Sequence, residues 1–262
     1  MKVMLFDGSM EELLMAVYHV YLDKYEPILV RSSDYVQNLM DEPFTLTYDP
    51  KAFMRVRDSM HRKFTEETLD IISYALNHRD PDAATWVLKY IIHCFNDPKK
   101  AFDYQNSLVM RVTKLSRQVS LESHRFTGFV RFSLVDSLYV AKIDPDHDIL
   151  EFIAPHFAER FPDMNFIIYD ESRHAAILSR NGDWTLKKDI QLNTDLLRTD
   201  SSTDEWREYF NNISIAARVN RRAQKRSMPK RYWKNLPETQ ISQAESSHKS
   251  VTLEASNLTE VK

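Results

Sequence analysis

Glycine and cysteine are the scarcest residues of this 262-residue chain, and their scarcity excludes several classes of site. The three glycines, Gly8, Gly128 and Gly182, lie far apart. A P-loop or a dinucleotide fingerprint instead needs clustered glycines, so that backbone N–H groups can approach phosphate oxygens. The single cysteine, Cys94, excludes a disulfide framework, a cysteine-rich zinc site and an iron–sulfur cluster held by this chain alone. We interpret Cys94 as a core residue and expect no cofactor in this chain.

Long apolar runs are also missing. No stretch approaches the roughly 20 apolar residues that a membrane-spanning helix needs. The first residues lack the layout of a signal peptide. We therefore expect a cytoplasmic protein that does not contact a membrane.

Apolar residues make up 43% of the chain, which is enough to fill a core. The pattern from residue 1 to 120 is mainly helical, with a short buried strand at Lys2–Phe6. Ser9 and Glu12 predict a capping box, in which each side chain accepts from the other's backbone N–H, before the first helix. Prolines break the stretch 26–50 into short extended pieces.

Two further helix starts are marked in this mainly helical region. Thr65 followed by two glutamates places a cap and negative charge at the positive end of a helix. Asp80 and Pro81 predict a cap and a first-turn proline for the next helix.

The pattern changes to strand periodicity between residues 121 and 190. A helix is expected over 148–161, and Asn181-Gly182 is a strong hairpin signal. The expected strands cover 126–134, 138–143, 165–170, 174–180 and 184–188. The order strand–strand–helix–strand–strand–strand predicts an antiparallel sheet with a helix on one face, so the expected fold class is α+β.

The last part of the chain divides into two stretches of different composition. Residues 203–238 predict a basic helix followed by a basic aromatic segment. Residues 239–262 are rich in Ser, Thr, Glu and Lys. They contain too few apolar side chains to offset the entropy of ordering, which predicts a disordered tail.

Charge is distributed unevenly along the sequence. Between Arg207 and Lys234 there are nine basic residues and one acidic residue, Glu208, which gives this segment a charge of +8. The whole chain has a formal charge of −3, so the remainder carries −11. Such asymmetry indicates a charge-specific partner for one end of the molecule.

The basic segment is the strongest functional signal. Its cations can neutralise phosphates, and aromatic side chains among them can stack on unpaired bases. The predicted nucleic-acid-binding residues are Arg218, Arg221, Arg222, Lys225, Arg226, Lys230, Arg231, Tyr232 and Trp233. The alternative is a solvated cationic helix, or one that docks on the acidic remainder of the chain or on another protein. A second basic stripe, Arg111, Lys114 and Arg117, is interpreted as a solvated helix face.

A second constellation could support catalysis. His124, His156 and Asp170 are candidate acid–base residues of the sheet unit. Phosphate or ion-pair candidates beside them are Arg125, Arg131 and Arg173. Spacing alone does not bring these side chains together, and the alternative is a set of turn caps and ion pairs.

The acidic stretch 144–148 raises the question of a metal site. It contains Asp144, Asp146, His147 and Asp148, and hard cations prefer carboxylate oxygens. It lacks the glycine and the distal glutamate of an EF-hand loop. We therefore interpret the stretch as the end of a strand, a turn and a helix start, and expect no metal.

Several stretches resemble a bacterial family described as probable DNA metabolism proteins, over nearly the whole chain to about residue 238. They are Phe6–Ser9, His124–Phe132, Ala141–His147, Ile153–Phe161, Asp170, Arg173 and Met228–Glu238. Phe166 departs from the pattern, where a tryptophan is expected. The resemblance implies a partner that is a radical-SAM protein of DNA modification or repair. It also implies a relation to regions fused to uracil-DNA-glycosylase-like domains, but it supplies no catalytic residues.

The leading hypothesis is a nucleic-acid-binding accessory protein in DNA modification or repair that acts with a radical-SAM partner. One alternative is a nucleic-acid-processing enzyme that uses the His/Asp/Arg constellation. The other is a protein adaptor that does not contact nucleic acid.

Overall fold

A computed structural model describes residues 2–135, 137–192 and 228–236 of the chain. The chain forms two compact units, and each is described by itself. Unit 1 comprises Met1–Glu122 and Asp146–Ile149, and unit 2 comprises Ser123–Pro145 and Leu150–Lys262. In the described part of the chain, no helix is long and apolar enough to cross a membrane.

Unit 1 contains a small parallel sheet. The predicted strand β1 (Lys2–Phe6) is confirmed and lies between β2 (Leu29–Arg31) and β3 (Glu42–Thr45), in the order β2-β1-β3. Both flanking strands run parallel to β1. Pro43 lies in the edge strand β3. Proline has no N–H to donate to a neighbouring strand, and an edge strand tolerates this because it has a neighbour on one side only. The short extended pieces expected over 26–50 are therefore parts of a sheet.

Helices make up the rest of unit 1. The helix α5 (Ser107–Phe129) belongs to both units: its residues up to Glu122 are part of unit 1, and those from Ser123 are part of unit 2. The helical elements are α1 (Met10–Leu22), α2 (Pro50–Lys63), α3 (Glu66–Leu76), α4 (Ala83–Asn96), the 3-10 turn η1 (Pro98–Phe102) and α5 (Ser107–Phe129). Cys94 is buried in the unit 1 core, and burial raises the pKa of its thiol to about 11. It is a core thiol, as expected.

Two of the predicted helix starts need correction. Ser9 does cap α1, with its hydroxyl accepting from the N–H of Glu12, but Glu12 accepts from the N–H of Asp7 rather than from Ser9. The side chain of Asp80 accepts from the N–H of Asp82, and α4 starts only at Ala83. Pro81 is therefore not the first helical residue. Thr65 caps α3 as predicted.

The expected strand over 126–134 is wrong in its first half. The helix α5 continues to Phe129, and β4 covers only Phe132–Val135. Helical spacing of the buried residues Val112, Leu115, Val119 and Phe126 keeps one apolar face of α5 against the interior.

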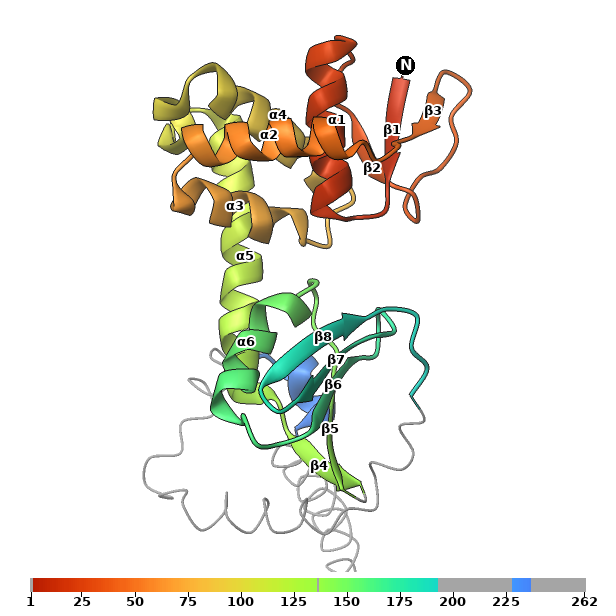
Figure 1. The fold of residues 1–262 in the computed structure, drawn as a ribbon, viewed down its shortest axis with the longest axis vertical. Helices are drawn as coiled ribbons and strands as arrows, with labels where there is room; N and C mark the ends of the chain where they lie inside the picture. Colours follow the sequence, from red (N-terminus) through yellow and green to blue (C-terminus); the bar gives the residue numbers. More distant parts are fainter. Residues whose placement is uncertain (1, 136, 193–227, 237–262) are drawn as a thin grey trace, which may run out of the picture. The chain divides into compact units, whose positions relative to one another are not determined.

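Unit 2 contains a five-stranded sheet in the order β4-β5-β6-β7-β8 (Figure 1). The α+β class and the order of elements are confirmed. The elements after β4 are β5 (Leu138–Ile143), α6 (Leu150–Arg160), β6 (Phe166–Asp170), β7 (Ala175–Arg180) and β8 (Asp183–Lys187). The sheet is mixed, because β5 and β6 pair in parallel while the other pairs are antiparallel. A parallel pair needs a crossover, and α6 provides it.

The hairpin predicted at Asn181-Gly182 is confirmed. Arg180 pairs with Asp183 across a two-residue turn. Both turn residues have positive φ, 53° at Asn181 and 80° at Gly182. This conformation defines the primed turns that match the twist of a hairpin.

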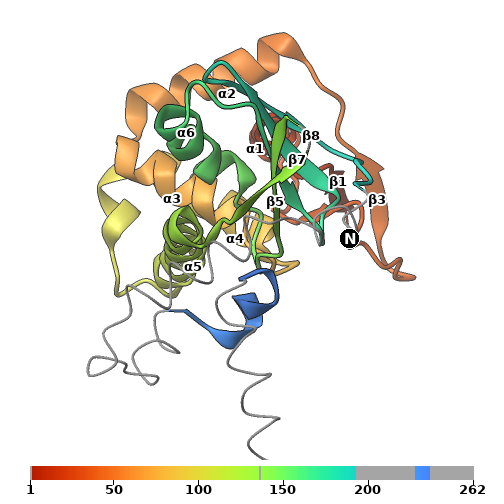
Figure 2. The same ribbon diagram turned by 90° about the horizontal axis from the view of Figure 1, so that it is seen from below.

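Only the end of the expected basic C-terminal region belongs to the described residues. The predicted helix from residue 203 to 227 and the predicted tail 239–262 lie outside them. Lys230–Asn235 forms a 3-10 turn, η4. Figures 1 and 2 both show this turn beside the end of α5, within unit 2.

Candidate nucleic-acid interface

The interface predicted from the basic segment is described at its C-terminal end. Arg218, Arg221, Arg222, Lys225 and Arg226 lie outside the described residues. Of the predicted contact residues in η4, Lys230 and Arg231 are exposed, Trp233 is half-buried and Tyr232 is buried. Four neighbouring residues therefore have three different environments.

Tyr232 anchors η4 rather than offering its ring to a base, which corrects the predicted stacking role. The side chain is only 4% exposed. Its ring lies edge-on to Phe126, with centroids 5.0 Å apart, and 5.9 Å from the ring of Phe129. Both phenylalanines come from the end of α5 in unit 2. Burial of such a ring stabilises a fold by several kcal/mol, roughly 3 or more when truncation to alanine is the measure.

Lys230, Arg231 and Trp233 form the accessible side of the turn. The indole N–H of Trp233 donates to the carbonyl of Met228 at 3.0 Å, which fixes the ring. The Lys230 ammonium lies 5.9 Å from the centre of the Trp233 ring. The Arg231 guanidinium lies 4.8 Å from the ring of Tyr232 and donates to its hydroxyl. The turn therefore presents two cations and part of an indole on a fixed backbone.

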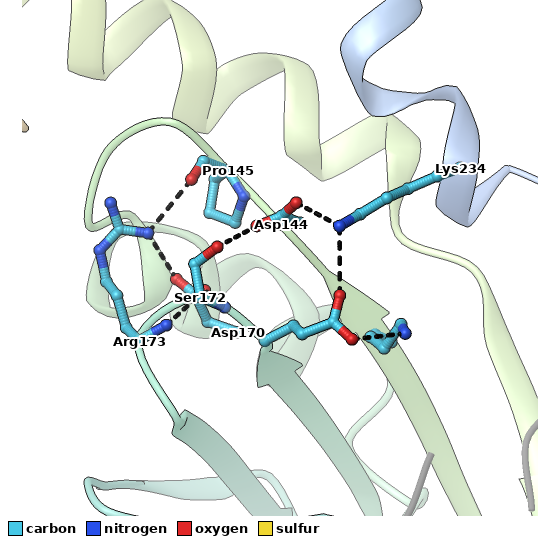
Figure 3. A network of polar contacts seen from close by, with 8 residues as sticks. Asp144, Pro145, Asp170, Ser172, Arg173 and Lys234 are labelled. Atoms are coloured by element: carbon cyan, nitrogen blue, oxygen red, sulfur yellow. Dashed lines mark hydrogen bonds and ion pairs between the residues drawn. The ribbon is translucent and has the colours of Figure 1, made fainter. Parts of the chain in front are cut away.

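Lys234 has a different role from the other cations of the segment. Its ammonium forms ion pairs with Asp144 and with Glu171, the latter at 3.2 Å (Figure 3). The hydrogen bond to Asp144 raises the pKa of Lys234, against a smaller opposing effect of burial. Carboxylates of this chain already neutralise this cation, so Lys234 is a second anchor of η4.

Lys234 and the residues linked to it by ion pairs and hydrogen bonds form what we call the ion-pair cluster: Lys142, Asp144, Glu171, Ser172 and Lys234. Asp144 follows β5 and Glu171 follows β6, and these two strands are parallel. The carboxyl ends of parallel strands meet at one edge of a sheet, which brings the two acids together. Figure 3 shows Asp144, Ser172 and Lys234 of this cluster beside the ends of the strands.

The ion-pair cluster holds its carboxylates in the charged state. Burial raises the pKa of Asp144, but hydrogen bonds from Lys234 and Ser172 outweigh it and leave the pKa below the ordinary value. The hydrogen bond from Lys142 lowers the pKa of Glu171, partly opposed by burial. A general acid or base needs a pKa near the working pH. These shifts run in the opposite direction, which is typical of a structural cluster.

Asp170 and Arg173 are engaged in holding the turn after β6. The fully buried carboxylate of Asp170 accepts from the N–H groups of Ser172 and Arg173. Its second oxygen pairs with the Arg173 guanidinium at 2.8 Å, and Arg173 also donates to the carbonyl of Pro145 at 3.2 Å (Figure 3). This geometry fits the turn-cap alternative for Asp170 better than the catalytic one.

The other members of the predicted catalytic constellation lie on helices or on the loop before β4. His124 and Arg125 lie on α5 and His156 on α6, and both histidines are exposed. Arg131 precedes β4 and donates to the carbonyls of Gly128 and Val130. Among the described residues, no hydrogen bond, ion pair or ring contact joins His124 or His156 to Asp170. The structure does not assemble these three side chains into one site.

The acidic stretch 144–148 is divided between different partners. Asp144 belongs to the ion-pair cluster of unit 2, whereas Asp146 pairs with Arg79 of unit 1 at 3.0 Å. Within the described ranges, no group of three or more His, Cys, Asp or Glu side chains could hold a metal ion.

Unit 1 contains a polar cluster that the sequence interpretation missed. We call it the histidine cluster, and it consists of His78, Gln118, Glu122 and His147. The buried carboxylate of Glu122 accepts from the N–H groups of Asp146 and His147 at 2.9 and 2.8 Å. The rings of His78 and His147 lie 4.2 Å apart. The residues are up to 69 positions apart in sequence, so no local spacing signals the cluster.

The histidine cluster is built from uncharged rings. Nδ1 of His78 accepts from the N–H of Asp80 at 2.9 Å, so Nε2 carries the proton and donates to Gln118. Nδ1 of His147 accepts from the N–H of Arg79 at 3.3 Å. Burial lowers the pKa of His78, although the hydrogen bond to Gln118 partly offsets it. The cluster therefore holds two loops through neutral acceptors.

Comparison with known proteins assigns the chain to a family. The family model described as a domain of unknown function, DUF4130, matches residues 81–238. The match begins before α4 and extends just past η4, so it includes most of unit 2. No curated protein and no solved structure matches the chain. The chain belongs to the DUF4130 family.

Proposed function

We propose that this protein is a nucleic-acid-binding accessory protein of DNA modification or repair, which binds DNA through its basic C-terminal segment. The observation that carries the proposal is the charge distribution: +8 between residues 207 and 234 against −11 in the rest of the chain. A concentrated cationic segment binds phosphates because binding releases condensed counterions.

The anchoring of η4 supports this function. Tyr232 and Lys234 fasten the turn to unit 2 through aromatic packing and ion pairs. Lys230 and Arg231 then remain exposed on a backbone that is already ordered. Preorganised contacts lose less entropy when they bind, so the same charges give more affinity than they would on a free chain. Among the described residues, Lys234 is neutralised by Asp144 and Glu171 of the ion-pair cluster.

The proposed partner is a radical-SAM protein, as the resemblance to probable DNA metabolism proteins implies. Radical-SAM chemistry requires an iron–sulfur cluster held by several cysteine thiolates. This chain has one cysteine, which is buried in unit 1. In this proposal the partner performs the radical chemistry, and the present chain binds the nucleic acid.

The test measures the affinity of the full chain for a DNA duplex across a range of salt concentrations. We expect log K to fall linearly with log salt, with a slope of roughly −0.9 for each phosphate contact. The variant Arg221→Gln/Arg222→Gln/Arg226→Gln should weaken binding and make the slope shallower. The matched control is Lys51→Gln/Lys99→Gln/Lys187→Gln, which removes three exposed lysines outside the segment and should change little.

A flat salt response of the unmodified protein would reject the proposal. It would favour the adaptor alternative, in which the basic segment contacts an acidic protein. Equal losses in the segment variant and in the control would show only a dependence on overall charge, and would also reject the segment as the binding site.

A further inference from the structure

A groove on unit 1 combines positive charge with exposed apolar side chains. It has a volume of about 570 Å³ and lies along the first part of α5. Its lining residues are Tyr104, Ser107, Met110, Arg111, Thr113, Lys114 and Arg117. The groove includes the stripe of cations interpreted from the sequence as a solvated helix face, and we call it the α5 groove. All of its residues belong to unit 1.

The charge of the α5 groove is only partly neutralised. Arg111 pairs with Asp80 at 2.6 Å, and its side chain remains 43% exposed. In the described ranges, no carboxylate lies within ion-pair distance of Lys114 or Arg117, which are both exposed. Three residues of helix advance about 4.5 Å along the axis, so the stripe spans about 9 Å.

Two large side chains in the α5 groove are exposed although they are apolar or aromatic. Tyr104 and Met110 are both 54% exposed. The tyrosine ring offers a face on which an unpaired base can stack, with the thioether of Met110 as an adaptable neighbour. Bases of a duplex are stacked on each other and are not available for such a contact.

A buried hydroxyl in the α5 groove lacks a partner. Within the described part of the chain, the Oγ of Thr113 is buried and makes no hydrogen bond. A buried donor without a partner costs about 1 to 3 kcal/mol. Thr113 lines the groove next to Lys114, but its buried hydroxyl is not accessible to a ligand in the groove.

We propose that the α5 groove is a binding site for single-stranded nucleic acid. Lys114 and Arg117 contact phosphates, and Tyr104 stacks on a base. Arg111 is held by Asp80 and contributes with its remaining N–H groups. The inference rests on the proposed nucleic-acid-binding function but assigns it a second surface, separate in sequence from residues 207–234.

The test uses fluorescence anisotropy of the full chain with a labelled single strand of roughly 20 nucleotides, longer than the site of a typical single-strand-binding domain. Lys114→Gln/Arg117→Gln should lower the affinity about tenfold and reduce the salt slope by roughly 1.4, or about 0.7 per lost contact on a single strand. The matched control, Lys51→Gln/Lys99→Gln, removes two exposed lysines of unit 1 and should retain affinity.

Two single substitutions that leave the charge unchanged distinguish binding in the α5 groove from binding through overall charge. Tyr104→Ala should weaken binding of the single strand by at least about fivefold and leave binding of the matched duplex unchanged. Thr113→Val replaces a hydroxyl by a methyl group of similar size. It should leave single-strand binding unchanged while the free energy of unfolding stays the same or rises, because an unpaired buried hydroxyl is removed. A loss of single-strand binding in this variant would show that packing of the groove, and not the stacking of Tyr104, controls the affinity.

The outcomes distinguish failure of this site from failure of the proposed function. If the groove variants bind normally while Arg221→Gln/Arg222→Gln/Arg226→Gln loses affinity, the α5 groove is rejected and the function is supported. If only the groove variants lose affinity, the groove is supported and the C-terminal site is rejected. Equal competition by polyglutamate and by an oligonucleotide of the same charge would reject the groove in favour of an acidic protein surface.

Discussion

The histidine cluster of unit 1 and the ion-pair cluster of unit 2 both hold loops in place, but with side chains in opposite states of charge. In unit 1, neutral imidazoles accept backbone N–H groups. In unit 2, charged carboxylates accept from ammonium groups and from a serine hydroxyl. The difference shows that one chain can fix its loops by two means, which respond differently to mutation and to pH.

The largest expected effect of a mutation concerns Asp170, which lies beside the ion-pair cluster in unit 2. Its carboxylate is fully buried and satisfies two backbone N–H groups and the Arg173 guanidinium. Asp170→Ala leaves these groups without their acceptor, so we expect a loss of about 3 to 5 kcal/mol in the free energy of unfolding. Urea unfolding followed by circular dichroism measures the loss.

A control from unit 1 sharpens this result. Asp146→Ala removes an ion pair with Arg79, in which the Arg79 side chain is 63% exposed and the Asp146 side chain 22% exposed. Ion pairs with an exposed partner contribute up to about 1 kcal/mol, so the free energy of unfolding of this variant should lie close to that of the unmodified protein. Similar losses for both variants would contradict the assignment of Asp170 as a buried structural group.

Parts of these clusters follow from sequence reasoning and parts do not. The strands β5 and β6 and the helix between them were predicted from their periodicity. A strand–helix–strand unit implies a parallel pair, whose ends would place Asp144 and Asp170 at one edge. The antiparallel expectation concealed this consequence. The parallel pairing of β5 and β6 follows from the helix that connects them, and strand periodicity alone does not contain it.

Packing between residues far apart in the sequence explains why the role of Tyr232, the histidine cluster and the end of α5 were not predicted. Tyr232 lies among cations in the sequence, which favours a stacking role, yet its ring is buried against Phe126 and Phe129 more than 100 positions earlier. His78 and His147 meet only after folding. The end of α5 was assigned to a strand because its aromatic residues suit both structures. Tertiary contacts decide such positions, and local propensity does not contain them.

Acidification should reduce the stability around the histidine cluster at a higher pH than the stability around the ion-pair cluster. The expected loss of stability is smaller than that caused by Asp170→Ala. Folding lowers the pKa of His78, so the unfolded chain takes up a proton near pH 6.5 while the folded unit 1 resists it. Unit 1 should lose stability as the pH falls below about 6.5, by at most about 1.4 kcal/mol per pH unit for this group. Above that pH, both states are neutral at His78 and its contribution is constant.

The ion-pair cluster should respond only at lower pH. The folded pKa values of Asp144 and Glu171 lie below their ordinary values of 3.8 and 4.5. Their stabilisation is therefore complete above about pH 4.5 and is lost as the pH falls through the folded pKa values. Hydrogen exchange of peptides from each unit, at pH 7 and pH 5.5 and corrected for intrinsic rates, should show loss of protection near residues 78–80 and 146–148 alone. His78→Asn, which keeps an acceptor, should remove much of that pH dependence.

The smallest expected effect concerns Lys234, whose side chain is half exposed. Lys234→Met removes its ion pairs with Asp144 and Glu171 and should cost at most about 1 kcal/mol. Tyr232→Ala should cost several times more, because it opens a cavity beside Phe126. Hydrogen exchange of residues 228–236 measures the local consequence of each substitution.

The same Lys234 variant distinguishes an anchor from a phosphate ligand. If Lys234 only fastens η4, Lys234→Met leaves the salt slope of DNA binding unchanged, because the number of phosphate contacts stays the same. If Lys234 contacts a phosphate, the slope becomes shallower by about 0.9. Neutralisation of the exposed Lys230 should produce that change, so Lys230→Met is the matched comparison within the same turn. An equal change of slope for both variants would show that DNA displaces Asp144 and Glu171 from Lys234, and the ion-pair cluster would then be part of the binding site.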